Sequence, residues 1–454
     1  MKLSFQIAVF ICFLASLLSC SLSKQIQQQA NNILQQDTVL KTGQYGISIY
    51  EPASNSYWYN YNADKYFVPA SNTKLFSMYA GMKYLGDSLV AARVEKSSDN
   101  NLYILPSGDP TFLHNEFNNQ PLVNYLNSLP NNCHVYVANN FWNANALGSG
   151  WAWDDYTAPY MAERSMMPLY GNLITFKFIG DTLTSMPYTL MDILISADFT
   201  TDEWGKFENR TKKKLPANFT IERLLGTNQY EFKKATEKFE EAELAMKIDD
   251  DLIKNLLAAK FSTLNFQTGK ILSPINKTHY QQIHSQPTDS LLKPMMHNSD
   301  NFFAEQTLLM ASNEHLGYMS DEAMIDTLLK SDLKDIPQKP TWVDGSGLSR
   351  YNLFTPQAFV YLLNKMKNEF GLERLKNILP TGGIGTLKNY YLSDSAFIYA
   401  KTGTLSGTIA LSGFLITHKN KLLIFSILTN NFKGRATSVR RAVEKFIQGI
   451  RKKY

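Results

Sequence analysis

The sequence predicts an α/β (α+β) domain in which helices cover an antiparallel sheet, and a large inserted region that splits this domain. Two observations lead to this fold class. Strand and helix patterns near the start of the chain, between residues 45 and 82, return after residue 288. From about 95 to 287 the pattern changes to short apolar runs, turns and a charged stretch. The two ends of the chain are therefore expected to build one sheet together with its helices.

Length and composition set the first limits. The chain has 454 residues, more than one ordinary hydrophobic core accommodates, so two or more domains are expected. Hydrophobic residues make up 44% and charged residues 19%, which indicates a folded chain. The net charge is +5, and no block of Lys and Arg indicates a nucleic-acid surface. We therefore expect no nucleic-acid partner.

Residues 1–20 have the pattern of a secretory signal peptide. Lys2 precedes an apolar run that ends at Leu18, and Ser19 follows. The letters LLSC, ending at Cys20, resemble a bacterial lipobox, in which the cysteine is lipid-modified and becomes the first residue of the mature protein. Ordinary cleavage nearby, with an incidental Cys20, is the alternative; the chain has only 3 cysteines, which favours the lipobox. The prediction is a periplasmic protein attached to a bacterial membrane through a lipid anchor only, because no other apolar run could span a bilayer.

The next segments form a linker and the first part of the split domain. Residues 21–36 are polar and are predicted to be a linker, and residues 37–95 begin the domain. Alternating patterns at 45–50 and 57–61 predict two strands joined by a turn. Pro69 precedes a helix whose apolar residues fall at spacings of three and four, namely Leu75, Met78, Tyr79 and Met82.

Residues 96–287 are predicted to form one or two inserted domains. The stretch contains an aromatic-rich loop, GSGWAWDDYTAPY, at 148–160. A charged part follows at 202–260, and within it the letters EFKKATEKFEEAELAMK at 231–247 predict a helix with a solvated face.

Residues 288–454 complete the split domain. A helix is predicted through NSDNFFAEQTLLMA at 298–311. Alternation predicts strands within 397–416 and at 421–429. The last segment predicts an amphipathic helix with one apolar stripe, formed by Val439, Val443, Phe446, Ile447 and Ile450.

The pattern S-x-x-K occurs four times, but only Ser71 and Lys74 open an apolar helix. Three residues is nearly one helical turn, so both side chains share a face. A serine hydroxyl is a poor nucleophile and needs a base within hydrogen-bond reach. A partly desolvated lysine can act as that base, and the helix N-terminus offers free amides to a developing oxyanion. A capping serine beside a solvent-reaching lysine is the purely structural alternative.

The patterns S-D-N and K-T-G each occur twice. The S-D-N at 98–100 lies in a polar turn, whereas Ser299 and Asn301 lie on the predicted helix and could offer a proton relay and an amide. The K-T-G at 41–43 is interpreted as a loop before the first strand. The K-T-G at Lys401 is flanked by alternating residues and followed by small ones, as expected for a strand that binds an extended peptide.

The order S-x-x-K, S-D-N, K-T-G is that of penicillin-binding proteins and class A β-lactamases. Together with further stretches, the chain resembles the penicillin-binding protein 4 family of D-alanyl-D-alanine carboxypeptidases and endopeptidases. These stretches are PSGDPTF at 106–112, GWAWDD at 150–155, DGSGLSRYN at 344–352 and LPTGGIGTL at 379–387. The resemblance covers most of the mature chain and is weakest at about 200–285.

The resemblance implies a penicillin-binding/β-lactamase-like domain split by inserted domains, and an enzyme that attacks peptidoglycan peptides and is acylated by β-lactam antibiotics. It implies no metal and no organic cofactor. The implied catalytic residues are Ser71 as nucleophile, Lys74 as base, Ser299 with Asn301 in proton relay, and Lys401. The implied substrate contacts are Thr402, Gly403 and Thr404, with Trp151, Asp154 and Arg350 for the diaminopimelate side chain. The backbone amides of Ser71 and Thr404 would form the oxyanion hole.

Other functions remain as alternatives. A β-lactamase shares the acylation machinery, but its second motif follows the first much more closely, and E-x-x-L-N spacing is absent. A Ser-His-Asp esterase would need a G-x-S-x-G turn, and a metallopeptidase would need H-E-x-x-H; neither occurs. His297 is interpreted as a polar residue at a helix end. A catalytically inactive, lipid-anchored peptidoglycan-binding protein is the non-enzymatic alternative.

Overall fold

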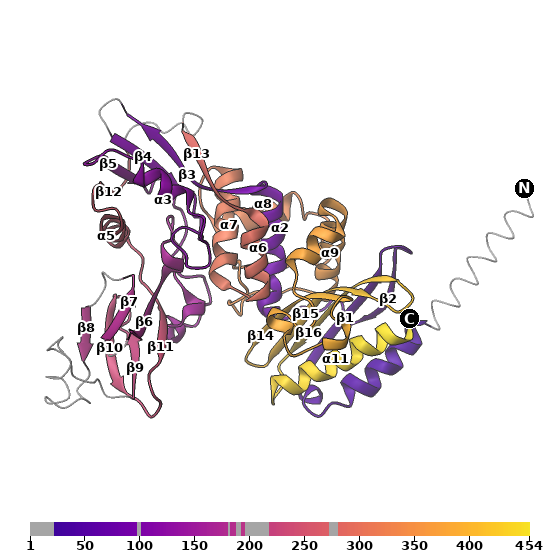
Figure 1. The fold of residues 1–454 in the computed structure, drawn as a ribbon. Helices are drawn as coiled ribbons and strands as arrows, with labels where there is room; N and C mark the ends of the chain where they lie inside the picture. Colours follow the sequence, from indigo (N-terminus) through magenta and orange to yellow (C-terminus); the bar gives the residue numbers. More distant parts are fainter. Residues whose placement is uncertain (1–21, 98–100, 180–181, 188–191, 196–217, 272–279) are drawn as a thin grey trace, which may run out of the picture. The chain divides into compact units, whose positions relative to one another are not determined.

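The computed structural model describes residues 22–97, 101–179, 182–187, 192–195, 218–271 and 280–454 (Figure 1). The predicted signal peptide with Cys20 and the first S-D-N at 98–100 lie outside these residues. The chain divides into two compact units, and each is described by itself. The first comprises residues up to 79, 292–300 and 325–454, and the second comprises residues 80–291 and 301–324.

The first unit contains a five-stranded antiparallel sheet built from both ends of the chain. The strand order is β14-β15-β16-β1-β2. The bounds are β1 Gln44–Glu51, β2 Ser56–Tyr61, β14 Ile398–Leu405, β15 Thr408–Ile416 and β16 Leu422–Asn430. β1 pairs with β16, with Ile47 opposite Ile427. The predicted union of N- and C-terminal strands in one antiparallel sheet is confirmed.

Helices cover both faces of this sheet. α11 (Ala436–Lys453) packs on one face, and α9 (Pro356–Phe370) packs on the other against β1 and β16 (Figure 1). The predicted apolar stripe of α11 is confirmed, because all five of its members are buried. Shorter helical elements that lie wholly in this unit are η1 Asn31–Gln35, η2 Leu40–Thr42, η3 Ala70–Thr73, α10 Leu372–Ile378, η8 Gly385–Leu387 and η9 Leu392–Asp394.

The predicted linker at 21–36 is wrong. Residues 22–30 form a helix that continues into the π-helical turn η1. Ile26, Ala30 and Leu34 are buried in the same core as α11, and the Gln29 side-chain amide donates a hydrogen bond to the Phe446 carbonyl oxygen at 3.1 Å. The three apolar residues recur at intervals of four, but they are outnumbered by Gln and Asn, which hid the stripe.

The second unit contains three small sheets. Their strand orders are β12-β5-β4-β3-β13, β11-β6-β7 and β8-β10-β9. The bounds are β3 Ser88–Lys96, β4 Asn101–Pro106, β5 His134–Ala138, β6 Leu173–Ile179, β7 Thr182–Met186, β8 Asp192–Ile195, β9 Phe219–Arg223, β10 Gln229–Lys234, β11 Glu241–Ala245, β12 Asn265–Gly269 and β13 Gln281–Pro287. The helical elements that lie wholly in it are α3 Pro121–Asn127, η4 Trp153–Asp155, η5 Pro159–Met161, η6 Tyr170–Asn172, α5 Asp250–Lys260 and α7 Asn301–Leu316.

The predicted helix at 231–247 is also wrong, because the segment forms most of β10 and all of β11. Tyr230 and Phe232 are buried at alternating positions of β10, which pairs with β9. The charged residue between them, Glu231, is only partly buried. Glu, Lys and Ala favour helices, and this composition misled the prediction where tertiary packing decided the outcome.

The boundaries of the two units differ from the predicted domain boundaries at 95/96 and 287/288. β3 belongs to the second unit, and so does α7, which was assigned to the split domain. The reason is packing: Ala92 and Val94 of β3, and Leu309 of α7, contribute to the hydrophobic core of the second unit.

Three further helices contain residues of both units: α2 Lys74–Tyr84, α6 Thr288–His297 and α8 Asp321–Lys330. Within the described part of the chain, no helix has the length and apolar character needed to cross a bilayer.

Candidate active site

The predicted nucleophile lies on η3, in the turn that leads into α2. Ser71 is half-buried, and Lys74 begins α2 with a side chain that is 0% exposed. The Lys74 Nζ atom lies 3.0 Å from the Ser71 Oγ atom. Ala70, just before the serine, has a φ of 47°, an uncommon conformation that the surrounding structure must hold in place. The geometry allows direct proton transfer between serine and lysine.

The loop at 344–352 supports this turn. The Lys74 Nζ atom also donates a hydrogen bond to the Ser346 carbonyl oxygen at 2.7 Å. Gly347 has a φ of 81°, and a Cβ atom there would lie 2.0 Å from the Ala70 carbonyl oxygen. Any larger residue at 347 would therefore displace the turn that carries Ser71.

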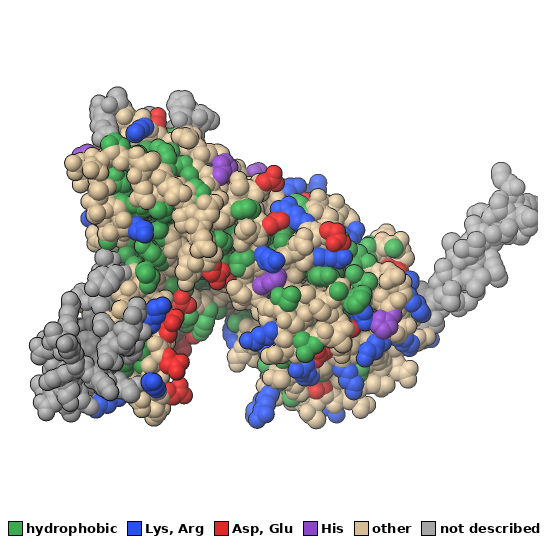
Figure 2. All heavy atoms as spheres, in the orientation of Figure 1, with side chains coloured by type: hydrophobic (Ala, Val, Ile, Leu, Met, Phe, Trp, Pro, Cys, Tyr) green, Lys and Arg blue, Asp and Glu red, His purple; other side chains and the backbone are tan. Residues whose placement is uncertain are grey.

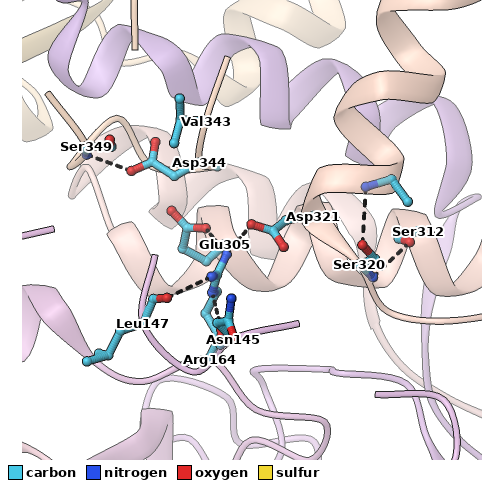
Figure 3. Close-up of polar contacts among 12 residues, drawn as sticks. Asn145, Leu147, Arg164, Glu305, Ser312, Ser320, Asp321, Val343, Asp344 and Ser349 are labelled. Atoms are coloured by element: carbon cyan, nitrogen blue, oxygen red, sulfur yellow. Dashed lines mark hydrogen bonds and ion pairs between the residues drawn. The ribbon is translucent and has the colours of Figure 1, made fainter. Parts of the chain in front are cut away.

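A buried carboxylate shapes that loop. Asp344 accepts hydrogen bonds from the backbone amides of Gly347 at 2.8 Å and Ser349 at 2.7 Å, the second of which Figure 3 shows. It also accepts one from the Asn352 side chain at 2.7 Å. This stretch supported the family resemblance and the prediction for Arg350, and no role was predicted for Asp344. Its Asp-Gly-Ser-Gly letters were the signal for a tight turn.

The second predicted lysine lies on β14. Lys401 is 0% exposed, and its Nζ atom donates hydrogen bonds to the Ser299 Oγ atom and the Thr402 carbonyl oxygen, both at 2.8 Å. Burial, with a smaller effect from the charge of Lys74, lowers the pKa of Lys401 well below its ordinary value. Lys401 can therefore exist without its proton in this site and exchange one with Ser299.

Gly403 allows β14 to approach the nucleophile turn. A Cβ atom at 403 would lie 2.7 Å from the Pro69 carbonyl oxygen and 3.1 Å from the Asn72 backbone nitrogen. The Asn72 side chain also donates a hydrogen bond to the Lys401 carbonyl oxygen at 3.0 Å. The glycine of K-T-G is thus needed for packing.

Ser71, Ser299, Thr402 and Thr404 line one pocket of about 840 Å³. Within the first unit, the structure therefore brings together the serine of S-x-x-K, the serine of the second S-D-N and the threonine of the second K-T-G. Two further segments also line the pocket: Gly385, Thr386, Lys388, Asn389, Tyr390 and Leu392, and Thr437, Arg440 and Arg441 of α11. Gly385 and Thr386 belong to the stretch LPTGGIGTL that supports the family resemblance, and the other residues were not predicted.

Asn301 begins α7 and belongs to the second unit. Its side-chain amide donates a hydrogen bond to the Tyr160 carbonyl oxygen at 2.8 Å. It follows Ser299 by two positions in the chain, and Ser299 itself has a φ of 59°. The predicted role of Asn301 remains a prediction.

His297 ends α6, as predicted. Burial and the nearby charge of Lys293 lower the pKa of His297. Its Nε2 atom has no hydrogen-bond partner among the described residues. No described contact joins it to Ser71.

Trp151 and Asp154 lie in the second unit. The Arg164 guanidinium carbon lies 5.6 Å from the centre of the Trp151 ring, and Asp154 is exposed. Figure 3 shows that Arg164 is held by the carbonyl oxygens of Asn145 and Leu147 at 2.9 and 3.2 Å.

Two buried or nearly buried carboxylates complete the surroundings of Arg164. Its guanidinium forms ion pairs with Glu305 at 3.4 Å and with Asp321 at 2.5 Å (Figure 3). Arg164 therefore adds a link between the aromatic loop and α7, beside the hydrogen bond from Asn301 to Tyr160.

Arg350 is exposed and donates a hydrogen bond to the Ser406 carbonyl oxygen at 3.2 Å. It therefore braces the turn after β14. It does not belong to the described residues that line the pocket of Ser71. A substrate role for Arg350 remains a prediction.

The site combines a serine with a buried lysine one helical turn away, and a second buried lysine on a strand of the sheet. This combination is typical of the penicillin-binding class of serine enzymes. The sequence profile of the D-Ala-D-Ala carboxypeptidase 3 (S13) family matches residues 26–454, and the chain belongs to this family.

Individual relatives agree with this assignment. The chain is 23% identical to D-alanyl-D-alanine carboxypeptidase DacB of Haemophilus influenzae over 407 residues, which cover 82% of each chain. It is 24% identical to a D-alanyl-D-alanine carboxypeptidase of Actinomadura sp. (strain R39), over 91% of this chain and 82% of that one. The crystal structure of penicillin binding protein 4 from Haemophilus influenzae has the same fold, with a TM-score of 0.70, 20% identity, and coverage of 93% of this chain and 98% of that one. The predicted family and fold class are confirmed.

Proposed function

We propose that this chain is a periplasmic serine DD-peptidase that removes terminal D-Ala from peptidoglycan peptides, or cleaves their D-amino-acid cross-links, through an acyl-Ser71 intermediate. The observation that carries the proposal is the 3.0 Å contact between the Lys74 Nζ atom and the Ser71 Oγ atom, at the edge of a pocket large enough for a peptide. Family membership supplies the class of bond that is attacked.

The acylation step uses the Ser71–Lys74 pair. Lys74 accepts the proton of Ser71 as the Oγ atom attacks the carbonyl carbon. The backbone amides of Ser71 and Thr404 would stabilise the oxyanion, an effect worth about 100-fold or more in rate. The carbon–nitrogen bond to the leaving residue then breaks, and the hydroxyl of Ser299, hydrogen-bonded to Lys401, delivers a proton to the departing amine.

Deacylation uses one water molecule. Lys401 first restores the proton that Ser299 gave to the amine. As the water attacks the ester carbon, it gives a proton through Ser299 to Lys401; the bond to the Ser71 Oγ atom breaks, and Lys74 returns to this oxygen the proton that it took during acylation. Thr402 on β14, with Gly403 beside it, would hold the peptide backbone and the terminal carboxylate. In this proposal Asn301, Trp151, Asp154 and Arg350 contribute further substrate contacts.

Penicillins would acylate Ser71 as substrate mimics. A structure of the related Haemophilus influenzae protein in complex with a β-lactam supports this part of the proposal; it has a TM-score of 0.65 and 19% identity to this chain. The proposal also includes a signal peptide and a lipid anchor at Cys20.

Covalent labelling with a fluorescent penicillin tests the acyl-enzyme. The full-length chain in detergent is incubated with the drug, and intact mass is measured beside the Ser71→Ala variant. We expect one adduct per chain in the parent and none in the variant. An adduct on both would mean that another serine is the nucleophile. No adduct on a folded parent would favour the inactive peptidoglycan-binding protein.

The fate of the adduct and of the peptides separates the remaining alternatives. A β-lactamase would release hydrolysed drug within seconds, whereas a DD-peptidase is expected to keep the adduct for minutes or longer. Incubation with a peptide ending in D-Ala-D-Ala, and separately with a cross-linked peptide dimer, then measures carboxypeptidase and endopeptidase activity by mass spectrometry.

A further inference from the structure

The pocket that contains Ser71 extends past β14 to the first turns of α11. Arg440, half-buried on α11, lines it together with Thr437. The Arg440 Nη2 atom donates a hydrogen bond of 2.7 Å to the Thr404 Oγ1 atom. An arginine from the last helix therefore lies directly beside the K-T-G-T strand.

The charge of Arg440 is not neutralised by an acidic side chain in the described part of the chain. A guanidinium carries five N–H donors, and the contact with Thr404 uses one of them. The next residue differs: Arg441 forms an ion pair of 2.5 Å with Glu444. Arg440 thus keeps donors and a full positive charge for a ligand.

The contact with Arg440 also determines which hydrogen bonds the Thr404 hydroxyl can make. Because the Thr404 oxygen accepts a hydrogen bond from Arg440, its own O–H remains to donate elsewhere. Thr402 lies two positions earlier on β14, and residues two apart share a face of a strand. Both threonine hydroxyls line the pocket, and no acidic residue lines it among those described. The donors in this part of the pocket suit an anion.

We propose that Arg440 is a specificity-determining residue that binds, with the hydroxyls of Thr402 and Thr404, the carboxylate of the leaving D-amino acid. The inference rests on the proposed function, since that reaction expels a residue whose carboxylate is free. Arg440 would form a charge-assisted hydrogen bond with this group, which a planar guanidinium can make with both oxygens at once.

A pair of substrates tests the proposal. One is an N-acylated tripeptide ending in D-Ala-D-Ala, and the other is its C-terminal amide, which lacks the negative charge. For the full-length chain in detergent, we expect kcat/KM to be about 100-fold higher for the acid. In Arg440→Gln the acid should lose about 10- to 100-fold and the amide should change little, the range expected for one charge-assisted hydrogen bond.

Two further variants complete the experiment. Arg440→Lys keeps the charge but not the planar fork, so it should recover part of the preference for the acid. Lys445→Gln removes one charge from an exposed position of the same helix outside the pocket, so its acid-to-amide ratio should equal that of the parent.

The acid-to-amide ratio is internal to each protein, so a partly unfolded preparation does not alter it. An unchanged ratio in Arg440→Gln, with both substrates slowed equally, would overturn the proposal and leave Arg440 a structural role. If the parent cleaves neither peptide and forms no penicillin adduct, the proposed function itself fails. Cleavage by the parent with equal rates for acid and amide would overturn this inference alone.

Discussion

At the scale of single residues, the site depends on burying two lysines. Lys74 and Lys401 are both 0% exposed, and each donates hydrogen bonds to a serine hydroxyl and to a backbone carbonyl oxygen. Removing an ammonium group from water costs free energy unless partners compensate for it, and the partners of Lys401, a serine hydroxyl and a backbone carbonyl oxygen, are neutral. The arrangement therefore favours proton transfer at the expense of stability.

Replacing Lys401 by Met should stabilise the fold near neutral pH while reducing acylation by about 100-fold or more, the scale of losing one pre-organised electrostatic group. The pKa of Lys401 is lowered in the folded state, so the unfolded state binds more protons between this pKa and the ordinary value of 10.5. In that window the stability of the parent rises with pH. The stabilising effect of Met should therefore be largest at low pH and shrink as pH approaches 10.5.

Thermal melts of parent and Lys401→Met between pH 6 and 9.5 measure this difference. The matched control is Lys421→Met, which removes an exposed lysine. The difference in Tm between this variant and the parent should not shrink as pH rises. A gap in Tm that widens with rising pH would contradict the explanation.

The sequence predicted a contact only where both partners lie close along the chain. Ser71 and Lys74 are three positions apart, and a helix pattern placed them on one face. Arg440 and Thr404 are 36 positions apart, and Lys74 and Ser346 are 272 apart. Their contacts depend on which strand lies next to which helix. No local pattern encodes that arrangement, so Arg440 and Ser346 were missed, whereas Thr404 and Lys74 were predicted from their motifs.

At the scale of elements, the candidate active site lies where β14 meets η3. The strand supplies Lys401 and Thr402 and the turn supplies Ser71, and Gly403 lets the two backbones come close together. Sequence alternation predicted the strand, and apolar spacing predicted the helix that follows the turn. Neither pattern predicted the distance between β14 and η3. This distance is small because Gly403 has no side chain.

Gly403→Ala should therefore impair the site more than the fold. The new Cβ atom would lie 2.7 Å from the Pro69 carbonyl oxygen, so β14 and η3 must move apart. We expect penicillin acylation to fall at least about 10-fold, since small displacements of reacting groups cost this much or more. The free energy of unfolding should fall by about 1–3 kcal/mol, as for other overpacked sites.

The control is Gly371→Ala, at the junction of α9 and α10. Gly371 has a φ of 81° and open space around it, so Ala costs about 1–3 kcal/mol in backbone strain without a steric clash and without moving β14 or η3. Stopped-flow acylation and urea unfolding measure both effects. Equal acylation rates for parent and Gly403→Ala would refute the packing role of this glycine.

Element prediction failed where composition and packing disagree. The segment at 231–247 is rich in helix-forming residues, yet β10 buries Tyr230 and Phe232 on alternate positions. Residues 22–35 are rich in Gln and Asn, yet three apolar residues anchor a helix. In both segments a few buried side chains decide the structure, and the surface residues that surround them carry the misleading signal.

At the scale of the whole molecule, the fold class could be predicted because the two ends of the chain carry strong patterns. β15 and β16 are buried along nearly their whole length, so the alternation and apolar runs of residues 397–430 were plain. The second unit combines three small sheets of strands that are mostly four to seven residues long. Short strands give weak periodic signals, which is why its internal organisation was not predicted.

The location of the whole molecule depends on its N-terminus. The first described helix starts at residue 22 and packs on α11 through Ile26, so a lipid at Cys20 would hold the first unit within a few residues of a membrane. Figure 2 shows Lys and Arg side chains spread over the visible face of this unit, with Asp and Glu side chains among them. We expect the mature chain to carry covalent lipid on Cys20.

Growth of a bacterial expression host with an alkyne-tagged fatty acid measures this modification. The parent should be labelled and found with membranes. Cys20→Ala should lose the label and appear in the soluble periplasmic fraction, still reactive with penicillin because Ser71 lies in the folded unit. Cys133→Ala is the matched control: this cysteine is buried in the second unit and forms no disulfide among the described residues, so its loss should leave the lipid in place. An unlabelled parent whose mature N-terminus is a residue other than Cys20 would show that an ordinary signal peptidase cleaves the chain.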